Sequence, residues 1–322
     1  MSDHQPLPYI APRRVVALCY QPNGRHTASI APLILGPACG NLAVLGSAGG
    51  LVVAEPPSSS DSPSAVAHLS AILGVPLTSF PSSPLIQPTP EACSPAAAYP
   101  PQYGRLCVQL LTSSAVAHRH VQLLISRQNH RNIAQHLLPP LLLPSQPLHS
   151  AADLTTHITA LLRDKQSEAN VLVVHVTHDT LSPKQSAEVD GQLLPPLLDE
   201  CLGHLLQAVG SRAVDTADGA LSDVYLTAIH LQPLQHTSPL DSSPLASFVP
   251  KQSYQLSVPS ASSTSALYLP LLSYHYNTTR SDACLHPSPP AQFELGSGGL
   301  IGATDWLAEL AFRLGGKAKY GA

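Results

Sequence analysis

The chain has 322 residues, carries a formal net charge of −4, and contains only 11% charged residues, against about 25% in ordinary soluble proteins. No basic cluster is larger than Arg13-Arg14, so nucleic-acid binding has no electrostatic support. The apolar run from Leu137 to Leu148 is broken by prolines, and no run is long enough to span a bilayer. We therefore expect neither a nucleic-acid partner nor a membrane-spanning segment.

The six cysteines include no Cys-x-x-Cys pair, and several lie in apolar segments. This pattern favours reduced thiols over a disulfide framework. The polar segment Met1–Arg14 lacks the apolar core of a signal peptide. Together these features predict an intracellular, cytoplasmic protein.

In the N-terminal half, short apolar runs predict strands and runs with helical spacing predict helices. The expected strands are 15–20, 51–54, 106–111 and 121–126, and the expected helical segments are 42–45, 65–73 and 131–138. The stretch 80–102 is rich in Pro, Ser and Ala, which is typical of a loop or a reduced insertion. We expect one domain over 1–322, with a reduced insertion or cap around 80–150.

The C-terminal half has stronger signals. Leu154, Ile158 and Leu161 recur at helical spacing. The expected helices are 151–163, 193–209 and 305–314, and the expected strands are 170–176, 224–229 and 267–274. Strands that alternate with helices predict an α/β fold, with a mainly parallel sheet and helices on both faces. Functional sites in such sheets lie at the carboxyl ends of the strands, here after Tyr20, Ala54, Val176 and Ile229.

Ser64 stands at the end of a Pro/Ser/Asp loop, directly before the apolar segment Ala65–Leu73. A serine at the start of a helix has its hydroxyl near backbone N–H groups without intrahelical partners. Such a position can hold an attacking oxygen or an anion. The structural alternative is that Ser64 only caps the helix, which is a commoner role for serine.

Three blocks of the chain resemble archaeal-type 2,3-bisphosphoglycerate-independent phosphoglycerate mutases, which belong to the alkaline-phosphatase superfamily. The first block contains Asn41-Leu42, Gly50-Leu51, Ala67-His68-Leu69-Ser70 and Leu73-Gly74. The second contains His175, Asp179, Asp199, Leu202-Gly203 and Thr227-Ala228-Ile229-His230. The third contains Thr279-Arg280-Ser281-Asp282, Phe293-Glu294, Gly298-Gly299-Leu300 and the ending Gly-Lys-Ala-Lys-Tyr-Gly-Ala.

The resemblance implies a three-layer alkaline-phosphatase-like fold and a phosphoryl-transfer site with two divalent metal ions. It places the nucleophile on Ser64 and metal ligands on Asp179 and His230, and His236 is a candidate for a further ligand. Several ligand positions depart from the family pattern. The chain has Cys19 or Tyr20, Ala65, Pro183 and Ile229 where the family has acidic residues or a histidine.

These departures matter because hard cations such as Mg²⁺ and Mn²⁺ require anionic oxygens. Asp179 is the one acidic residue among the carried-over ligands, and two histidines with one carboxylate suit a single Zn²⁺ or Fe²⁺ better. Asp179 and His230 also have structural alternatives, as a turn cap and as a core histidine. The sequence therefore favours a divergent, non-catalytic relative with a binding or scaffold role.

The alternative hypothesis is a metal-dependent phosphomutase or phosphatase that uses Ser64 as phosphoryl acceptor, with Mn, Mg or Zn as cofactor. A small phosphorylated substrate is then the expected ligand. If the protein is non-catalytic, no cofactor is expected. The protein partner and the role of the repeated Pro-Lys-Gln-Ser segments at 183–186 and 250–253 stay open.

Overall fold

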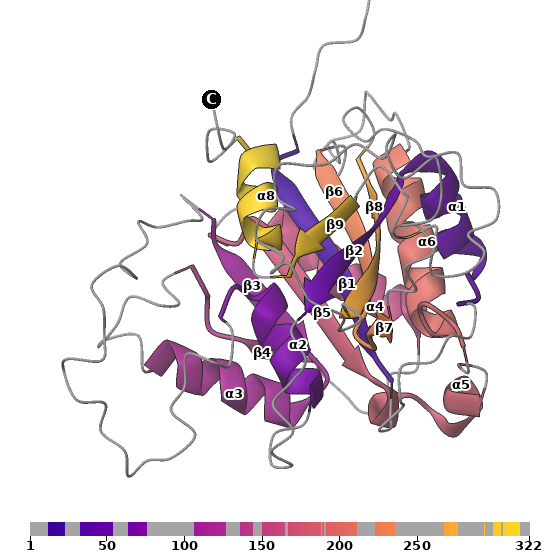
Figure 1. Ribbon diagram of the computed structural model, residues 1–322, viewed down its shortest axis with the longest axis horizontal. Coiled ribbons are helices and arrows are strands. Elements are labelled where there is room, and N and C mark those ends of the chain that lie inside the picture. The colour runs from indigo at the N-terminus through magenta and orange to yellow at the C-terminus, as the bar shows by residue number, and fades with distance from the viewer. Residues whose placement is uncertain are drawn as a thin grey trace, which may run out of the picture.

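The computed structural model describes residues 12–22, 33–53, 64–75, 106–126, 136–143, 150–164, 167–187, 189, 191–210, 223–235, 267–275, 293, 299–303 and 305–315 (Figure 1). The strands are β1 (Arg14–Gln21), β2 (Ser47–Val53), β3 (Val108–Thr112), β4 (Leu141–Leu142), β5 (Val171–Thr177), β6 (Val224–His230), β7 (Leu234–Gln235), β8 (Leu267–Tyr274) and β9 (Gly299–Gly302). The helices are α1 (Pro37–Leu45), α2 (Ser64–Ile72), α3 (Ala115–Ser126), α4 (Ala151–Arg163), α5 (Pro183–Ala187), α6 (Pro196–Gly210) and α8 (Trp306–Arg313), with a 3-10 turn η5 (His178–Thr180).

The strands form one mainly parallel sheet, in the order β4-β3-β5-β1-β6-β8-β2-β9, with β7 pairing with β8. Strand β8 is antiparallel to β6, β2 and β7, while the other pairings in this order are parallel. The predicted α/β fold class is therefore confirmed. Strand β1 lies between β5 and β6, so its two backbone edges are both paired inside the sheet.

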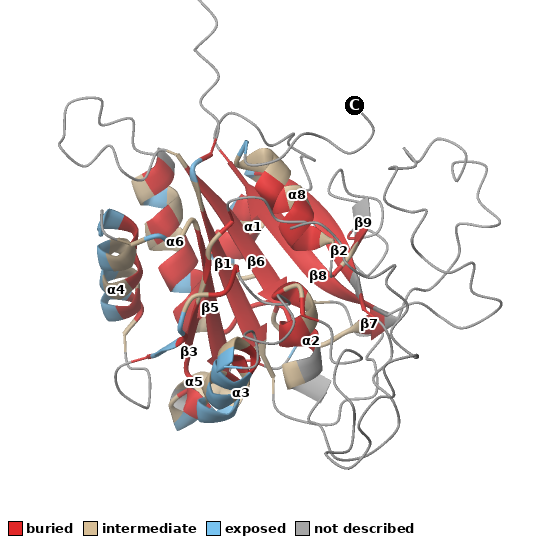
Figure 2. Cartoon of the chain, turned by 90° about the vertical axis from the view of Figure 1, so that its left-hand side faces the viewer, coloured by how far each residue is buried: buried red, intermediate tan, exposed pale blue. Residues whose placement is uncertain are grey.

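Alternation of side chains along β1 separates two apolar layers. Val16 and Leu18 pack with buried residues of α1, α4 and α6, whereas Val15 and Ala17 pack with those of α2, α3 and α8. Figure 2 shows the strands buried almost throughout between the two groups of helices. Helices on both faces, as expected, give three layers. None of the described helices is both long and apolar enough to cross a membrane.

A buried carboxylate joins α1 to α6. Asp199, near the start of α6, accepts hydrogen bonds from the backbone N–H groups of Ala38 (3.0 Å) and Cys39 (2.8 Å) in the first turn of α1. A Cβ on Gly36 would lie 2.4 Å from the Asp199 carboxyl carbon, so the approach requires glycine at this position. Asp199, which matched the mutase pattern, thus has a structural role as a cap supplied by another helix.

Two expectations from the sequence are corrected. Residues 121–126 are not a strand but the second half of α3, in which Ala117, Val121 and Leu124 form the buried helical face. The mostly apolar segment Val121–Ile125 contains both helical and strand signals, and the preceding turn of helix decides between them. The described part of the expected helix 131–138 is a turn with a single bridge from Leu137 to Val108.

Strand β2 begins at Ser47, four residues before the expected start at residue 51, so Gly49-Gly50 lies inside the strand. Pairing with β8 on one side and β9 on the other extends this strand through both glycines. Residues 80–102 lie outside the described part of the chain. Within the expected insertion around 80–150, the described segments contribute β3, α3 and β4 to the main sheet and to one helical layer.

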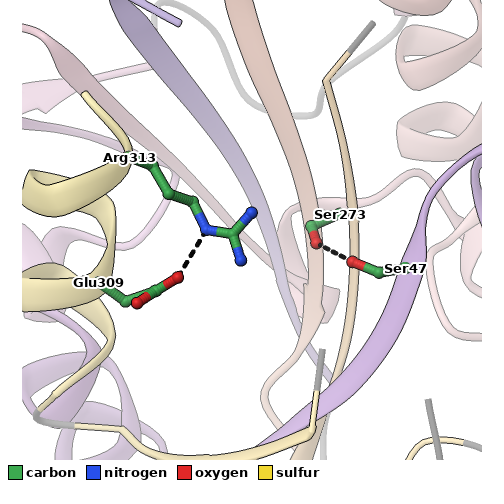
Figure 3. A network of polar contacts seen from close by, with 4 residues as sticks. All are labelled: Ser47, Ser273, Glu309 and Arg313. Atoms are coloured by element: carbon green, nitrogen blue, oxygen red, sulfur yellow. Dashed lines mark hydrogen bonds and ion pairs between the residues drawn. The ribbon is translucent and has the colours of Figure 1, made fainter. Parts of the chain in front are cut away.

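Figure 3 shows two polar pairs, one between the paired strands β2 and β8 and one within helix α8. Ser47 of β2 and its register partner Ser273 of β8 are buried, and their hydroxyls lie 2.9 Å apart. On α8, the Nε–H of Arg313 donates to Glu309 at 2.8 Å, and the guanidinium lies over the Tyr225 ring at 5.4 Å from its centroid. These contacts connect the reversed strand and the last helix to the sheet.

The Ser47–Ser273 pair leads to a prediction. We expect Ser47→Ala to lower the free energy of unfolding by about 1–2 kcal/mol, because it leaves a buried hydroxyl without this partner. The double variant Ser47→Ala/Ser273→Ala should cost less than the sum of the single variants, since no partner is then left behind. Urea unfolding of the four proteins in this cycle measures the coupling. Strict additivity would show that the hydroxyls do not interact.

Candidate functional site

The carboxyl ends of β1, β5 and β6 lie level with one another. In the register of the sheet, Cys19 stands between His175 of β5 and Ile229 of β6. One residue further, Tyr20 stands beside His230. The sequence positions that the mutase resemblance singled out on three separate strands are therefore neighbours at one edge of the sheet, where α/β proteins place their sites.

Alternation divides these neighbours between the two faces of the sheet. Cys19 and Ile229 belong to the apolar cluster that also contains Leu69 and Ile72 of α2. Tyr20 points to the opposite face, toward the layer formed by α1, α4 and α6. The helix that begins at Ser64 thus packs on the face that carries the thiol and the alkyl side chain.

Cys19 and Ile229 do not fit a hard-metal site. Both side chains are fully buried in an apolar environment. Burial strongly raises the pKa of the Cys19 thiol, which therefore stays protonated at neutral pH. Hard divalent cations require anionic oxygens, and neither a neutral thiol nor an alkyl group supplies one. The residues present at these two central positions thus cannot hold Mg²⁺ or Mn²⁺.

His230 is buried on the other face of the sheet. Its Nδ1–H donates to the backbone carbonyl of Leu193 at 2.8 Å, and its ring lies 5.7 Å from the Tyr20 ring, centroid to centroid. Burial lowers the pKa of His230, and the hydrogen bonds to Leu193 and Gln232 oppose that shift without cancelling it. A neutral imidazole with Nδ1–H held by a carbonyl is compatible both with a core histidine and with a metal ligand.

Asp179 lies in the turn η5 that follows β5, and its side chain is exposed. The preceding residue, His178, is half-buried, and its Nδ1 lies 2.8 Å from the Tyr20 hydroxyl. Tyr20 therefore contacts both His178 after β5 and His230 at the end of β6. This aromatic contact between three strand ends was not foreseen from the sequence, because it depends on the sheet register.

His175 is a hydrogen-bonded core histidine. Its Nε2 lies 2.9 Å from the Gln21 side-chain oxygen, and the Thr112 hydroxyl lies 2.8 Å from its Nδ1. Since an amide oxygen only accepts, Nε2 carries the proton and Thr112 donates to Nδ1. Burial lowers the pKa of His175 to about 4, although the charge of Asp179 raises it in part. His175 is thus neutral at physiological pH.

A cluster of buried hydroxyls lies between the ends of β3 and β5. Ser113 accepts a hydrogen bond from the Thr177 backbone N–H at 3.0 Å and from the Thr180 hydroxyl at 3.0 Å. Helix α3, which follows β3, packs on one face of the sheet, and α6, the first long helix after β5, packs on the other, so this is a topological switch point. The sequence signal for this cluster was the polar residues directly after two predicted strands, Thr112 and Ser113 after 106–111 and Thr177 after 170–176. In the structure these hydroxyls bind one another.

Helix α2 begins at Ser64, in agreement with the helix start that the sequence indicates. The Ser64 side chain and His236 lie outside what the structure describes, so their predicted roles stay predictions. One turn after Ser64, the buried His68 donates Nδ1–H to the carbonyl of Leu231 at 3.2 Å, and no described residue contacts its Nε2 through a hydrogen bond. In the described ranges, no group of three His, Cys, Asp or Glu side chains is arranged to hold a metal ion.

No protein-family model and no curated protein matches the sequence. Among solved structures, the chain is similar to the PH0037 protein from Pyrococcus horikoshii, with 13% identity, a TM-score of 0.45, and coverage of 98% of this chain and 100% of that chain. It is also similar to alkaline phosphatase from the Antarctic bacterium TAB5, with 11% identity, a TM-score of 0.40, and coverage of 96% and 99%. At these values the likeness concerns chain arrangement and assigns no activity.

Proposed function

We propose that this protein is a non-catalytic relative of the alkaline-phosphatase-like phosphoryl-transfer proteins, with a binding or scaffold role. The observation that carries the proposal is the pairing of Cys19 with Ile229 at the centre of the carboxyl edge. Both are fully buried, and both belong to the apolar cluster against which the Ser64 helix packs. A nucleophilic serine needs a base or a metal to lower its pKa, and these two residues are neither.

The remaining candidate ligands support the same proposal. Asp179 is exposed, and His230 is enclosed between Tyr20 and the Leu193 carbonyl. Two divalent ions held close together carry a charge of about +4, which several carboxylates must offset. We therefore expect no stoichiometric binding of paired Mg²⁺ or Mn²⁺ ions and no phosphoglycerate mutase turnover.

Metal analysis combined with an activity assay tests the proposal. The full chain is incubated with Mn²⁺, Mg²⁺ or Zn²⁺, desalted, and analysed by inductively coupled plasma mass spectrometry. The same samples are assayed for mutase activity on 3-phosphoglycerate and for phosphatase activity on p-nitrophenyl phosphate. We expect metal far below one ion per chain and rates equal to those of Ser64→Ala. Stoichiometric metal with turnover that Ser64→Ala abolishes and the exposed control Ser126→Ala retains would overturn the proposal.

A second candidate function is a metal-dependent phosphomutase or phosphatase. The observation that favours it is the start of α2 at Ser64, with the buried His68 one helical turn later. This arrangement keeps a serine near free backbone N–H groups. For this candidate, His230→Ala should release bound metal and abolish turnover, whereas a non-catalytic protein would show neither effect.

A further inference from the structure

Helix α2 is attached to the carboxyl edge of the sheet through His68. This side chain lies one turn after the start of the helix and is 4% exposed. Its Nδ1–H donates to the backbone carbonyl of Leu231, directly after β6, at 3.2 Å. The N–H of Leu231 donates to the carbonyl of Tyr20 in β1 at 2.8 Å. One histidine therefore joins the first half of α2 to the ends of two central strands.

The surroundings of His68 accept only the neutral imidazole. A carbonyl cannot donate, so Nδ1 carries the proton and Nε2 of the neutral ring carries a lone pair. Nε2 is buried, and no described residue offers it a hydrogen bond. An imidazolium donates from both nitrogens, so the charged form would place a buried N–H without an acceptor beside α2. The docked helix therefore requires an uncharged ring.

The titratable groups around His68 do not offset this cost. On the same face of the sheet, such groups belong to four further elements: Cys19 on β1, His175 on β5, His118, Arg119 and His120 on α3, and Asp305 before α8. The Cys19 thiol and the His175 imidazole are neutral at physiological pH. Asp305 is acidic, and within the described ranges it forms no ion pair with His68. Burial lowers the pKa of His68, and the hydrogen bond to Leu231 opposes this shift only in part.

The second half of α2 has two attachments of its own. The Ser70 hydroxyl lies 3.0 Å from Nε2 of His120 on α3, and a hydroxyl can accept as well as donate. The Nε2–H of His136 donates at 2.8 Å to the carbonyl of Leu73, directly after the helix. This nitrogen is a donor in both charge states, and a positive charge is favoured at the C-terminal end of a helix. Both hydrogen bonds therefore persist when the rings are protonated.

We propose that His68 is a pH-sensitive latch, whose protonation releases the first half of α2 from the carboxyl edge while the second half stays attached. Release uncovers part of the face on which Cys19 and Ile229 lie. Because the pKa of docked His68 is lowered, the latch is closed above about pH 6.5 and opens as the pH falls below that value. The latch needs neither metal nor catalysis, so the inference stands apart from the proposed function.

The test is amide hydrogen exchange of the full chain at pH 7.5 and pH 5.5, resolved to single residues and corrected for the intrinsic pH dependence of exchange. The amides of residues 68–71 report on the first turn, because their helical acceptors are the carbonyls of residues 64–67. Their protection should fall by about three- to tenfold at pH 5.5, where a released imidazole binds a proton that the docked one does not. The Leu73 amide, which donates to Leu69, and the amides of β5 should keep their protection.

A matched pair of variants assigns the effect to His68. His68→Gln retains a donor for Leu231 but does not titrate, so its protection at 68–71 should be the same at both pH values. The control His157→Gln, at a half-buried site on α4 in the other layer, should keep the wild-type response. If His68→Gln does not fold, the contrast within the wild type still decides. Unchanged protection at 68–71, an equal loss at Leu73 or in β5, or a response that persists in His68→Gln would each overturn the proposal. Metal binding with turnover would overturn only the proposed function.

Discussion

Replacement of Asp199 by alanine is expected to lower the free energy of unfolding by about 3–5 kcal/mol, because two charge-assisted hydrogen bonds are lost and two buried N–H groups remain. Those N–H groups belong to Ala38 and Cys39, in the first turn of α1. Gly36, directly before α1, offers no side-chain cap of its own. The first backbone N–H groups of helix α1 therefore depend on a side chain of α6 for their hydrogen bonds.

Two matched variants sharpen this experiment. Asp199→Asn retains one acceptor oxygen and loses the charge, so we expect a loss about half as large. Glu200→Ala changes the exposed neighbour on α6 and should alter stability by less than about 0.5 kcal/mol. Urea unfolding followed by circular dichroism measures all three. An Asp199→Ala protein as stable as the wild type would refute the capping role.

Acidification is expected to destabilise the protein steeply below about pH 6.5, because several buried histidines are neutral in the folded state. Burial lowers the pKa values of His68, His136 and His230, and it lowers that of His175 from 6.5 to about 4. Between the folded and the unfolded pKa values, the unfolded chain therefore binds more protons than the folded chain does. Stability is fully present above pH 6.5 and is lost as pH falls toward 4. His175 alone accounts for about 3 kcal/mol of this loss.

A comparison of pH profiles isolates the contribution of His175. The free energy of unfolding is measured in urea at intervals from pH 8 to pH 4, for the wild type and for His175→Gln. Glutamine keeps a donor and an acceptor for Gln21 and Thr112 but does not titrate. We expect the difference in free energy of unfolding between the two proteins to be constant above pH 7. Toward pH 4, the wild type should lose about 3 kcal/mol more than His175→Gln does. Profiles that stay parallel throughout would show that His175 takes up its proton equally in both states.

The elements with strong local patterns could be predicted from the sequence. Helix α4 and strand β8 have the bounds that their periodicity predicted, and β1, β5 and β6 agree within one or two residues at each end. The strands β4, β7 and β9 were missed because segments of this length carry no periodicity of their own. Such strands exist because neighbouring strands offer backbone partners, which is a tertiary effect.

The candidate site was harder to predict, because its meaning depends on register and on the face that each side chain occupies. The sequence indicated that the acidic residues expected at Cys19 and Ile229 are absent. It could not indicate that these residues are direct partners across two parallel strands, or that Tyr20 contacts both His178 and His230. The predicted roles of Ser64 and His236 stay predictions, since the described residues do not include the Ser64 side chain or His236.

The central position of β1 has a consequence for folding during translation. The two strands that flank it come from residues 171–177 and 224–230, so a nascent chain must carry β1 with both backbone edges open until both segments have left the ribosome. The centre of the sheet can therefore fold only after both segments have been synthesised. Until then, the unpaired edges of β1 can pair with another chain or bind a chaperone. A ribosome-stalled fragment that ends before β5 should accordingly be sensitive to protease, whereas a chain released after β8 should resist it.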